Sequence, residues 1–215
     1  MLDQFINSMK KIFALAALSS TLFSCNNDDD TAAPAEEAFF NFEVGDVWAY
    51  KWYTSEAGTL TATNRVDTVK ITGTDEFNGK TYFKFQTILY SGGNANATEY
   101  DYKRIDDNGY LVDRYERVLH PGTDTDFTDE YPALVNGDTI AYINTQLYPS
   151  QLIDVEGTSY SAYNYEGYLT PNSNGTPEGL GFQTVYSPGI GLIKLKARYI
   201  SSANVFIESH LTYHN

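Results

Sequence analysis

The feature that most restricts the fold is a repeated alternation of β-forming runs with short turns, in a chain without a sustained helical pattern. The runs are rich in Thr, Tyr, Val, Ile and Phe, and pairs of Gly, Asn and Asp separate them. Nowhere does an apolar period of three to four residues continue past two turns. The sequence therefore predicts an all-β chain, with room for one helical turn between Tyr142 and Leu152, before Pro149.

Two turn signals indicate how the strands pair. Asn78-Gly79 separates the runs Thr68–Gly73 and Thr81–Tyr90, and Asn-Gly between apolar runs is the strongest short hairpin signal. Asp107-Asn108-Gly109 is a second signal of this kind. We expect an antiparallel meander. Its other predicted strands are Val47–Thr54, Glu99–Ile105, Tyr110–Tyr115, Thr139–Ile143, Gln151–Val155, Ser159–Leu169, Gly181–Tyr186, Gly191–Tyr199 and Val205–Tyr213.

About ten hairpin-connected strands have to protect their edges, either by curling into a barrel or by pairing as a sandwich. We expect a curled or half-open barrel, and a β-sandwich is the alternative. The predicted interior residues are Trp48, Tyr82, Phe83, Phe85 and Ile88.

The N-terminus has the form of a secretory signal over residues 1–24. Met9, which is the better candidate for the true start, precedes two lysines and a short apolar run. The triplet Leu22-Phe23-Ser24 resembles a bacterial lipobox, and Cys25, the only cysteine, follows it. We therefore expect signal cleavage before Cys25 and lipidation of its thiol by an acyl chain such as palmitate.

Residues 25–38 are short, polar or acidic, and they predict a flexible tether to a single domain over residues 39–215. The run Asn26 to Asp30 resembles the export tag of surface lipoproteins of Bacteroidota. The resemblance implies an exported outer-membrane lipoprotein, and display on the cell surface is compatible with it.

The chain is strongly acidic, with 28 Asp and Glu against 14 Lys and Arg and a net charge of −14. Such a field repels phosphate, so nucleic acid is excluded as a partner. The expected partners are the membrane, through the lipid anchor, and a glycan or an envelope protein. No basic residue lies between Arg117 and Lys194, which predicts one very negative region.

Two groups of side chains are candidate binding residues. Four carboxylates within seven residues offer oxygen ligands to calcium, although the loop lacks the Gly and Glu positions of an EF-hand and could serve solubility alone. They are Asp124, Asp126, Asp129 and Glu130. Aromatic side chains suit a glycan-binding face, although β-propensity also explains many of the 18 tyrosines. The candidates are Trp52, Tyr163 and Tyr165.

Catalytic patterns are missing from the sequence. There is no Gly-x-Ser-x-Gly elbow, and His120, His210 and His214 have neither triad context nor zinc spacing. Paired carboxylates for glycoside hydrolysis cannot be judged from sequence spacing. We expect a protein that is not an enzyme and needs no cofactor, apart from the calcium alternative.

Four motifs resemble a pattern of uncharacterised Bacteroidota lipoproteins. A G-x-x-W-x-Y strand begins at Gly45, an N-G-K-x-Y hairpin at Asn78 and a P-G-x-G turn at Pro188, and Asp107-Asn108-Gly109 lies between them. The resemblance spans most of the mature domain. It implies the β-fold and the export route, and it transfers no catalytic residue.

The predicted function is non-enzymatic binding of an extracellular ligand, which could be a glycan, an apolar molecule or a protein. One alternative is a structural or assembly component of an envelope complex. The other is a lipid carrier, which would require an apolar cavity.

Overall fold

The computed structural model describes residues 38–215 except 136, 172–178 and 199–204. Twelve strands and no helix occur in this part of the chain. The predicted signal, Cys25 and nearly all of the tether lie outside the described residues. The strands are β1 (Val47–Glu56), β2 (Thr59–Phe77), β3 (Lys80–Ser91), β4 (Asn94–Ile105), β5 (Leu111–Asp113), β6 (Val118–His120), β7 (Glu130–Val135), β8 (Asp138–Val155), β9 (Thr158–Pro171), β10 (Gly179–Ser187), β11 (Gly191–Arg198) and β12 (Val205–His214).

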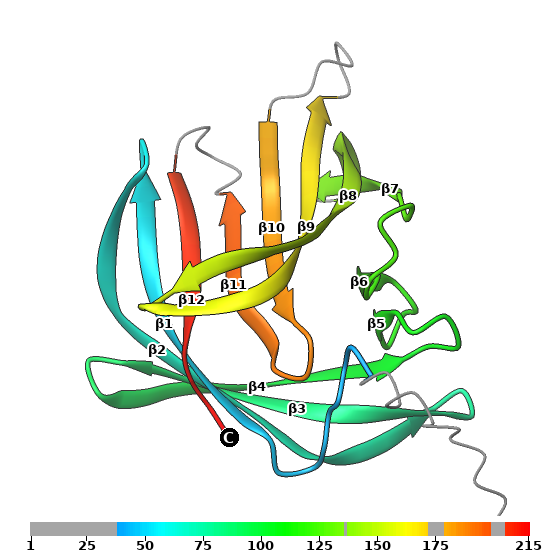
Figure 1. The fold of residues 1–215 in the computed structure, drawn as a ribbon, viewed down its shortest axis with the longest axis horizontal. Helices are drawn as coiled ribbons and strands as arrows, with labels where there is room; N and C mark the ends of the chain where they lie inside the picture. Colours follow the sequence, from blue (N-terminus) through cyan, green and yellow to red (C-terminus); the bar gives the residue numbers. More distant parts are fainter. Residues whose placement is uncertain (1–37, 136, 172–178, 199–204) are drawn as a thin grey trace, which may run out of the picture. The chain divides into compact units, whose positions relative to one another are not determined.

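All twelve strands belong to one antiparallel sheet, in the order β6-β5-β4-β3-β2-β1-β12-β11-β10-β9-β8-β7. Successive strands pair in two meanders, and pairing of the first strand with the last joins the two meanders. The sheet curls without closing, since its edge strands β6 and β7 do not pair with each other (Figure 1). The predicted half-open barrel is confirmed, and the sandwich alternative is wrong because there is a single sheet.

Turn chemistry fixes the β2–β3 hairpin as predicted. Asn78 and Gly79 have φ values of 52° and 74°, and two consecutive positive φ angles are those of a type I′ turn. The second predicted turn joins β4 to β5. There, a carboxylate oxygen of Asp106 accepts hydrogen bonds from the backbone nitrogens of Asn108 and Tyr110, at 3.0 and 2.8 Å.

The strands differ from the prediction mainly in length and at the edges. β8 runs unbroken from Asp138 to Val155, so the helical turn allowed before Pro149 is wrong. A register shift between Tyr148 and Gln151 leaves Pro149 unpaired with β9, and this bulge accommodates a residue that has no N–H to donate. The edge strands β6 and β7 were not predicted from the sequence.

The main core cluster draws buried side chains from both meanders, including Trp48, Ile71, Phe85, Val185 and Ile193. Trp48 and Phe85 are thus confirmed as interior residues. The segment before β1 joins this core, because the Phe42 ring lies 5.5 Å from Phe85 and 6.0 Å from Trp48, centroid to centroid. Aromatic packing therefore holds the start of the domain inside the curled sheet.

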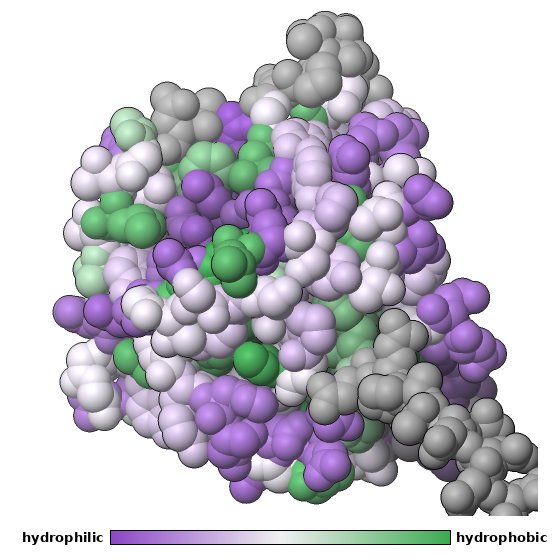
Figure 2. All heavy atoms as spheres, in the orientation of Figure 1, coloured by the Kyte–Doolittle hydropathy of each residue, from purple (hydrophilic) through white to green (hydrophobic). Residues whose placement is uncertain are grey.

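The surface carries apolar side chains in small, separate patches on the face shown in Figure 2. Polar and weakly apolar residues lie between these patches. Among the described residues there is no helix of the length and apolarity that crossing a membrane requires.

Candidate functional site

Trp52, the first of the predicted aromatic binding residues, lies in a small polar cluster. Its indole Nε1 donates a hydrogen bond of 2.8 Å to Asp67. The Arg65 guanidinium lies 4.0 Å from the centroid of the indole and forms an ion pair of 2.6 Å with Asp67. A sugar stacked on this ring would have to compete with Arg65 for the indole face.

The other two predicted residues lie on β9 and differ in exposure. Tyr163 is half-buried, with its ring 5.3 Å from that of Phe39, whereas Tyr165 is only 1% exposed. The three aromatic residues therefore do not share one exposed face, because Tyr165 belongs to the interior. Glycan binding by Trp52 and Tyr163 stays a prediction.

The four predicted calcium ligands do not gather around one point. Among the described residues, no group of three or more His, Cys, Asp or Glu side chains is placed to hold a metal ion. Asp124 instead accepts a hydrogen bond from the Tyr110 hydroxyl, which raises the pKa of that hydroxyl to about 12. The Asp129 carboxylate accepts a hydrogen bond of 2.8 Å from the backbone nitrogen of Glu130, the first residue of β7. The backbone nitrogen of Asp126 also donates a hydrogen bond of 3.1 Å to a carboxylate oxygen of Asp124.

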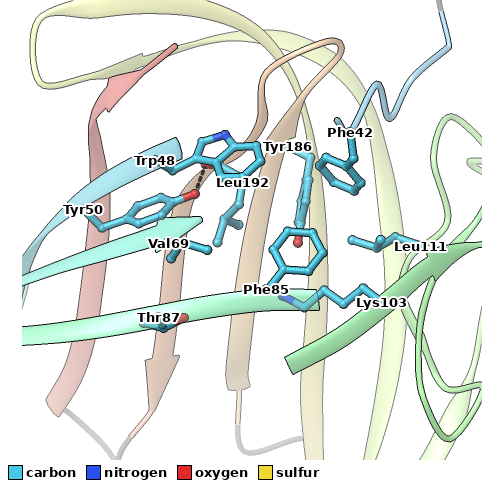
Figure 3. A pocket seen from close by; sticks show the side chains of 10 residues that line it. All are labelled: Phe42, Trp48, Tyr50, Val69, Phe85, Thr87, Lys103, Leu111, Tyr186 and Leu192. Carbon is cyan, nitrogen blue, oxygen red and sulfur yellow. Dashed lines mark hydrogen bonds between the residues drawn. The ribbon is translucent and has the colours of Figure 1, made fainter. Parts of the chain in front are cut away.

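A cavity of about 80 Å³ lies within the curled sheet, between strands of both meanders (Figure 3). Aromatic and aliphatic side chains form most of its wall. The lining residues are Phe42, Trp48, Tyr50, Val69, Phe85, Thr87, Lys103, Leu111, Tyr186 and Leu192. None of the ten is His, Cys, Asp or Glu, and the titratable groups of the wall are the Lys103 ammonium and the hydroxyls of Tyr50 and Tyr186. We call this cavity the interior pocket.

The polar atoms of two wall residues have backbone partners. Trp48 Nε1 donates to the carbonyl of Ile190 at 2.7 Å, and Tyr50 Oη donates to the carbonyl of Leu192 at 2.9 Å. Both acceptors belong to the connection into β11 or to its start. These bonds fix the two rings and leave their apolar surfaces towards the interior pocket.

Lys103 is the one charged residue of the pocket wall. Its Nζ lies 4.7 Å from the centroid of the Phe85 ring (Figure 3). Burial lowers the pKa of this ammonium, and the charges of Asp101 and Asp113 oppose that shift only in part. Among the ion pairs of the described residues, none includes Lys103.

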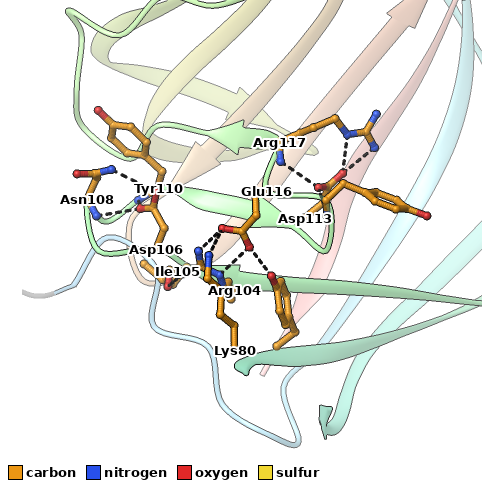
Figure 4. A network of polar contacts seen from close by, with 11 residues as sticks. Lys80, Arg104, Ile105, Asp106, Asn108, Tyr110, Asp113, Glu116 and Arg117 are labelled. Atoms are coloured by element: carbon orange, nitrogen blue, oxygen red, sulfur yellow. Dashed lines mark hydrogen bonds and ion pairs between the residues drawn. The ribbon is translucent and has the colours of Figure 1, made fainter. Parts of the chain in front are cut away.

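Asp113 lies opposite Lys103 in the β4–β5 pairing but is bonded to other groups. One carboxylate oxygen accepts from the backbone nitrogens of Tyr115 and Arg117, at 2.8 and 3.1 Å. The other carboxylate oxygen accepts a hydrogen bond of 2.8 Å from Nε of Arg117 (Figure 4). Lys103 is consequently left with a cation–π contact in place of a carboxylate partner.

A surface network holds this side of the pocket in place (Figure 4). Glu116 has a left-handed φ of 64°, and its carboxylate accepts hydrogen bonds from Lys80, Tyr82 and Arg104. These donors come from β3 and β4. The network therefore joins the β5–β6 turn to the strands that carry Phe85 and Lys103.

His120 lies beside the pocket and contacts Phe40 and Tyr186, which form a second core cluster with Leu111. It is fully buried, and its ring stacks on Phe39 at 5.3 Å and tilts against Tyr186 at 4.6 Å. Its Nδ1 accepts a hydrogen bond of 3.1 Å from the backbone nitrogen of Gly122. Burial lowers the pKa of His120 to about 3, although the backbone at Tyr163 raises it slightly.

Four pocket residues were not predicted as site residues from the sequence, although Tyr50 belongs to the G-x-x-W-x-Y motif. They are Lys103, Tyr50, Tyr186 and Leu192. The alternation of side chains along a strand gives information on two of them. It places Tyr50 on the same face of its strand as Trp48, and it fixes which residues share a face with Lys103. Contacts between β1 and the β10–β11 region depend on sheet curvature, and no sequence signal reports them.

No protein-family model matches the chain, and no curated protein matches its sequence. Three solved structures match the chain at low sequence identity. A Bacteroides fragilis protein described as exported, with a YmcC-like fold, has 13% identity and a TM-score of 0.47, over 84% of this chain and 100% of that one. A Parabacteroides distasonis protein described as a lipoprotein has 14% identity and a TM-score of 0.43, over 83% and 99%. A Vibrio parahaemolyticus domain described as an outer-membrane lipoprotein-sorting protein domain has 11% identity and a TM-score of 0.23, over 81% and 86%.

Proposed function

We propose that the protein is an exported envelope protein, lipid-anchored at Cys25, whose β-domain binds a short apolar molecule in the interior pocket and performs no chemistry on it. The observation that carries the proposal is the aromatic-lined cavity, where Trp48 and Tyr50 have their polar atoms bonded to the backbone. Binding there removes apolar ligand surface from water at little cost to the wall.

The pocket size favours a short ligand over the long acyl chains of a lipid carrier. At about 80 Å³ it is smaller than the roughly 150 Å³ cavity that admits benzene. Each methylene that enters should tighten binding about fourfold, because its burial contributes about 0.8 kcal/mol. The gain should stop once the pocket is full.

Calorimetric titration of the purified protein with butanol, hexanol and octanol tests this. We expect affinity to rise with chain length and then to level off. Val69→Phe places a larger ring at the pocket wall and should abolish binding. Val66→Phe, on the same strand but 41% exposed and outside the pocket lining, is the matched control and should bind normally. No binding by the wild type, or equal binding by both variants, would refute an apolar site.

The anchor has its own test. Cys25→Ser should abolish labelling with a radioactive fatty acid and move the protein from the membrane fraction to the soluble one. Labelling that persists in this variant would place the lipid elsewhere or refute lipidation.

An assembly role is the second candidate, favoured by one observation. β5 pairs with β4 only from Lys103 to Ile105, so the outer edge of residues 94–102 has no partner among the described strands. An unpaired edge can accept a strand from another protein. Replacing Thr98 by Pro should abolish such pairing and leave alcohol binding intact.

A further inference from the structure

Lys103 gives the interior pocket a second property besides its apolar wall. Its side chain is half-buried, its Nζ lies against the Phe85 ring, and it has no ion-pair partner among the described residues. Taking an ammonium out of water without an anion costs free energy. A lysine serving packing alone would extend its ammonium into solvent. An anion inside the pocket would compensate the cost.

The nearby acids do not supply that anion. Asp113 is bonded to Arg117 and to two backbone nitrogens, as described above. Asp101 is solvent-exposed and raises the pKa of Lys103 only through its charge. With no carboxylate in the pocket wall, the position in front of Nζ is open to an anion brought by a ligand.

We propose that the ligand of the interior pocket carries a carboxylate, which Lys103 binds, on a short apolar body that lies against Trp48, Tyr50 and Phe85. This inference rests on the proposed function, since it concerns the same pocket. A single ammonium matches a single negative charge. A phosphate would require several cations or N–H donors, and this wall offers one cation and the hydroxyls of Thr87 and Tyr186, since the Tyr50 hydroxyl already donates to the Leu192 carbonyl.

Matched acids and amides separate the role of charge from that of apolar burial. Hexanoate and hexanamide, and butyrate and butanamide, differ little in shape but differ in charge. We expect the purified wild-type protein to bind each acid about tenfold more tightly than its amide in calorimetry at low salt. Inorganic phosphate at the same concentration should not displace the acid.

Three variants locate the effect. Lys103→Met keeps the length of the side chain and should reduce the acid-to-amide ratio to about one. Lys103→Arg keeps the charge and should retain a preference for the acid. Lys84→Met is the matched control: this lysine also lies over aromatic rings, those of Tyr100 and Tyr102, but it pairs with Asp75 outside the pocket, so the variant should leave the ratio unchanged.

The outcomes distinguish this inference from the proposed function. Equal binding of acid and amide by the wild type would refute the carboxylate inference and still support an apolar binding site. Binding of neither would overturn both. Displacement of the acid by phosphate would show that the site at Lys103 binds a different anion, and it would refute the carboxylate inference. The comparison of acid and amide binding by the wild type tests the inference even if a variant fails to fold.

Discussion

Replacement of His120 by Asn should remove most of the loss of stability that the protein suffers between pH 8 and pH 5. In the native state Nδ1 accepts a hydrogen bond from the backbone nitrogen of Gly122. Protonation would place a second donor opposite that N–H and put a charge among Phe39, Tyr165 and Tyr186. The folded protein therefore resists protonation of this imidazole, while the unfolded chain accepts it.

The magnitude follows from the two pKa values. The folded pKa of about 3 lies below the unfolded value of about 6.5. His120 thus contributes stability that is complete above the unfolded pKa and is lost as the pH falls. At pH 5 the linkage relation gives a loss of about 2 kcal/mol, rising towards about 5 kcal/mol below pH 3. For a domain of this size, 2 kcal/mol corresponds to a decrease in Tm of roughly 4–8 °C.

Urea unfolding followed by the fluorescence of Trp48 and Trp52 at pH 8, 7, 6 and 5 measures this dependence. His120→Asn keeps an acceptor for the Gly122 N–H and does not titrate. The variant should be less stable at pH 8, and its free energy of unfolding should change with pH by about 2 kcal/mol less than that of the wild type. Parallel pH profiles for the two proteins would refute the assignment to His120.

Three further substitutions have expected outcomes that thermal or urea unfolding can check. Gly167→Ala would place a Cβ 2.1 Å from the Phe182 ring, and this overpacking should lower the free energy of unfolding by about 1–3 kcal/mol. Gly73→Ala is the control, because its Cβ meets open space and should cost much less stability. Equal losses of stability in the two variants would contradict the steric argument. Glu208→Gln removes a buried charge that binds two lysines and a histidine. We expect a loss of about 1.5–3 kcal/mol at pH 7 that shrinks as the pH falls towards 2, because burial favours the neutral acid but these partners outweigh it and lower the Glu208 pKa to about 2. Lys103→Met should raise Tm at pH 7, because it removes a desolvated ammonium whose pKa burial lowers; a lower Tm would indicate a structural role for the charge.

Local signals in the sequence predicted the fold class and the short-range pairing. Asn78-Gly79 specified its hairpin because positive φ angles are a property of those two residues, independent of the rest of the chain. The same local reasoning failed at Pro149, where the bulge in β8 accommodates the proline within a strand. The short β6 was missed because three residues are too few to display an alternation.

The candidate site was much less predictable than the fold. Sequence reasoning selected Trp52, Tyr163 and Tyr165 for their aromatic character, yet Tyr165 is buried, and the described cavity lies elsewhere. Tyr50 and Lys103 lie 53 positions apart in the sequence and share a wall only because β1 to β4 pair side by side and curl around the same space.

The sequence by itself determined the all-β class, the two clearest turns and the strongly negative charge, and it predicts a leader that is processed at Cys25. Each of these depends on neighbouring residues or on composition. The tertiary structure alone decided that β1 pairs with β12, that the sheet stays open, and that Lys103 faces an aromatic wall without an acidic partner. Those features depend on strand register and sheet curvature, which arise from the packing of residues distant in the chain.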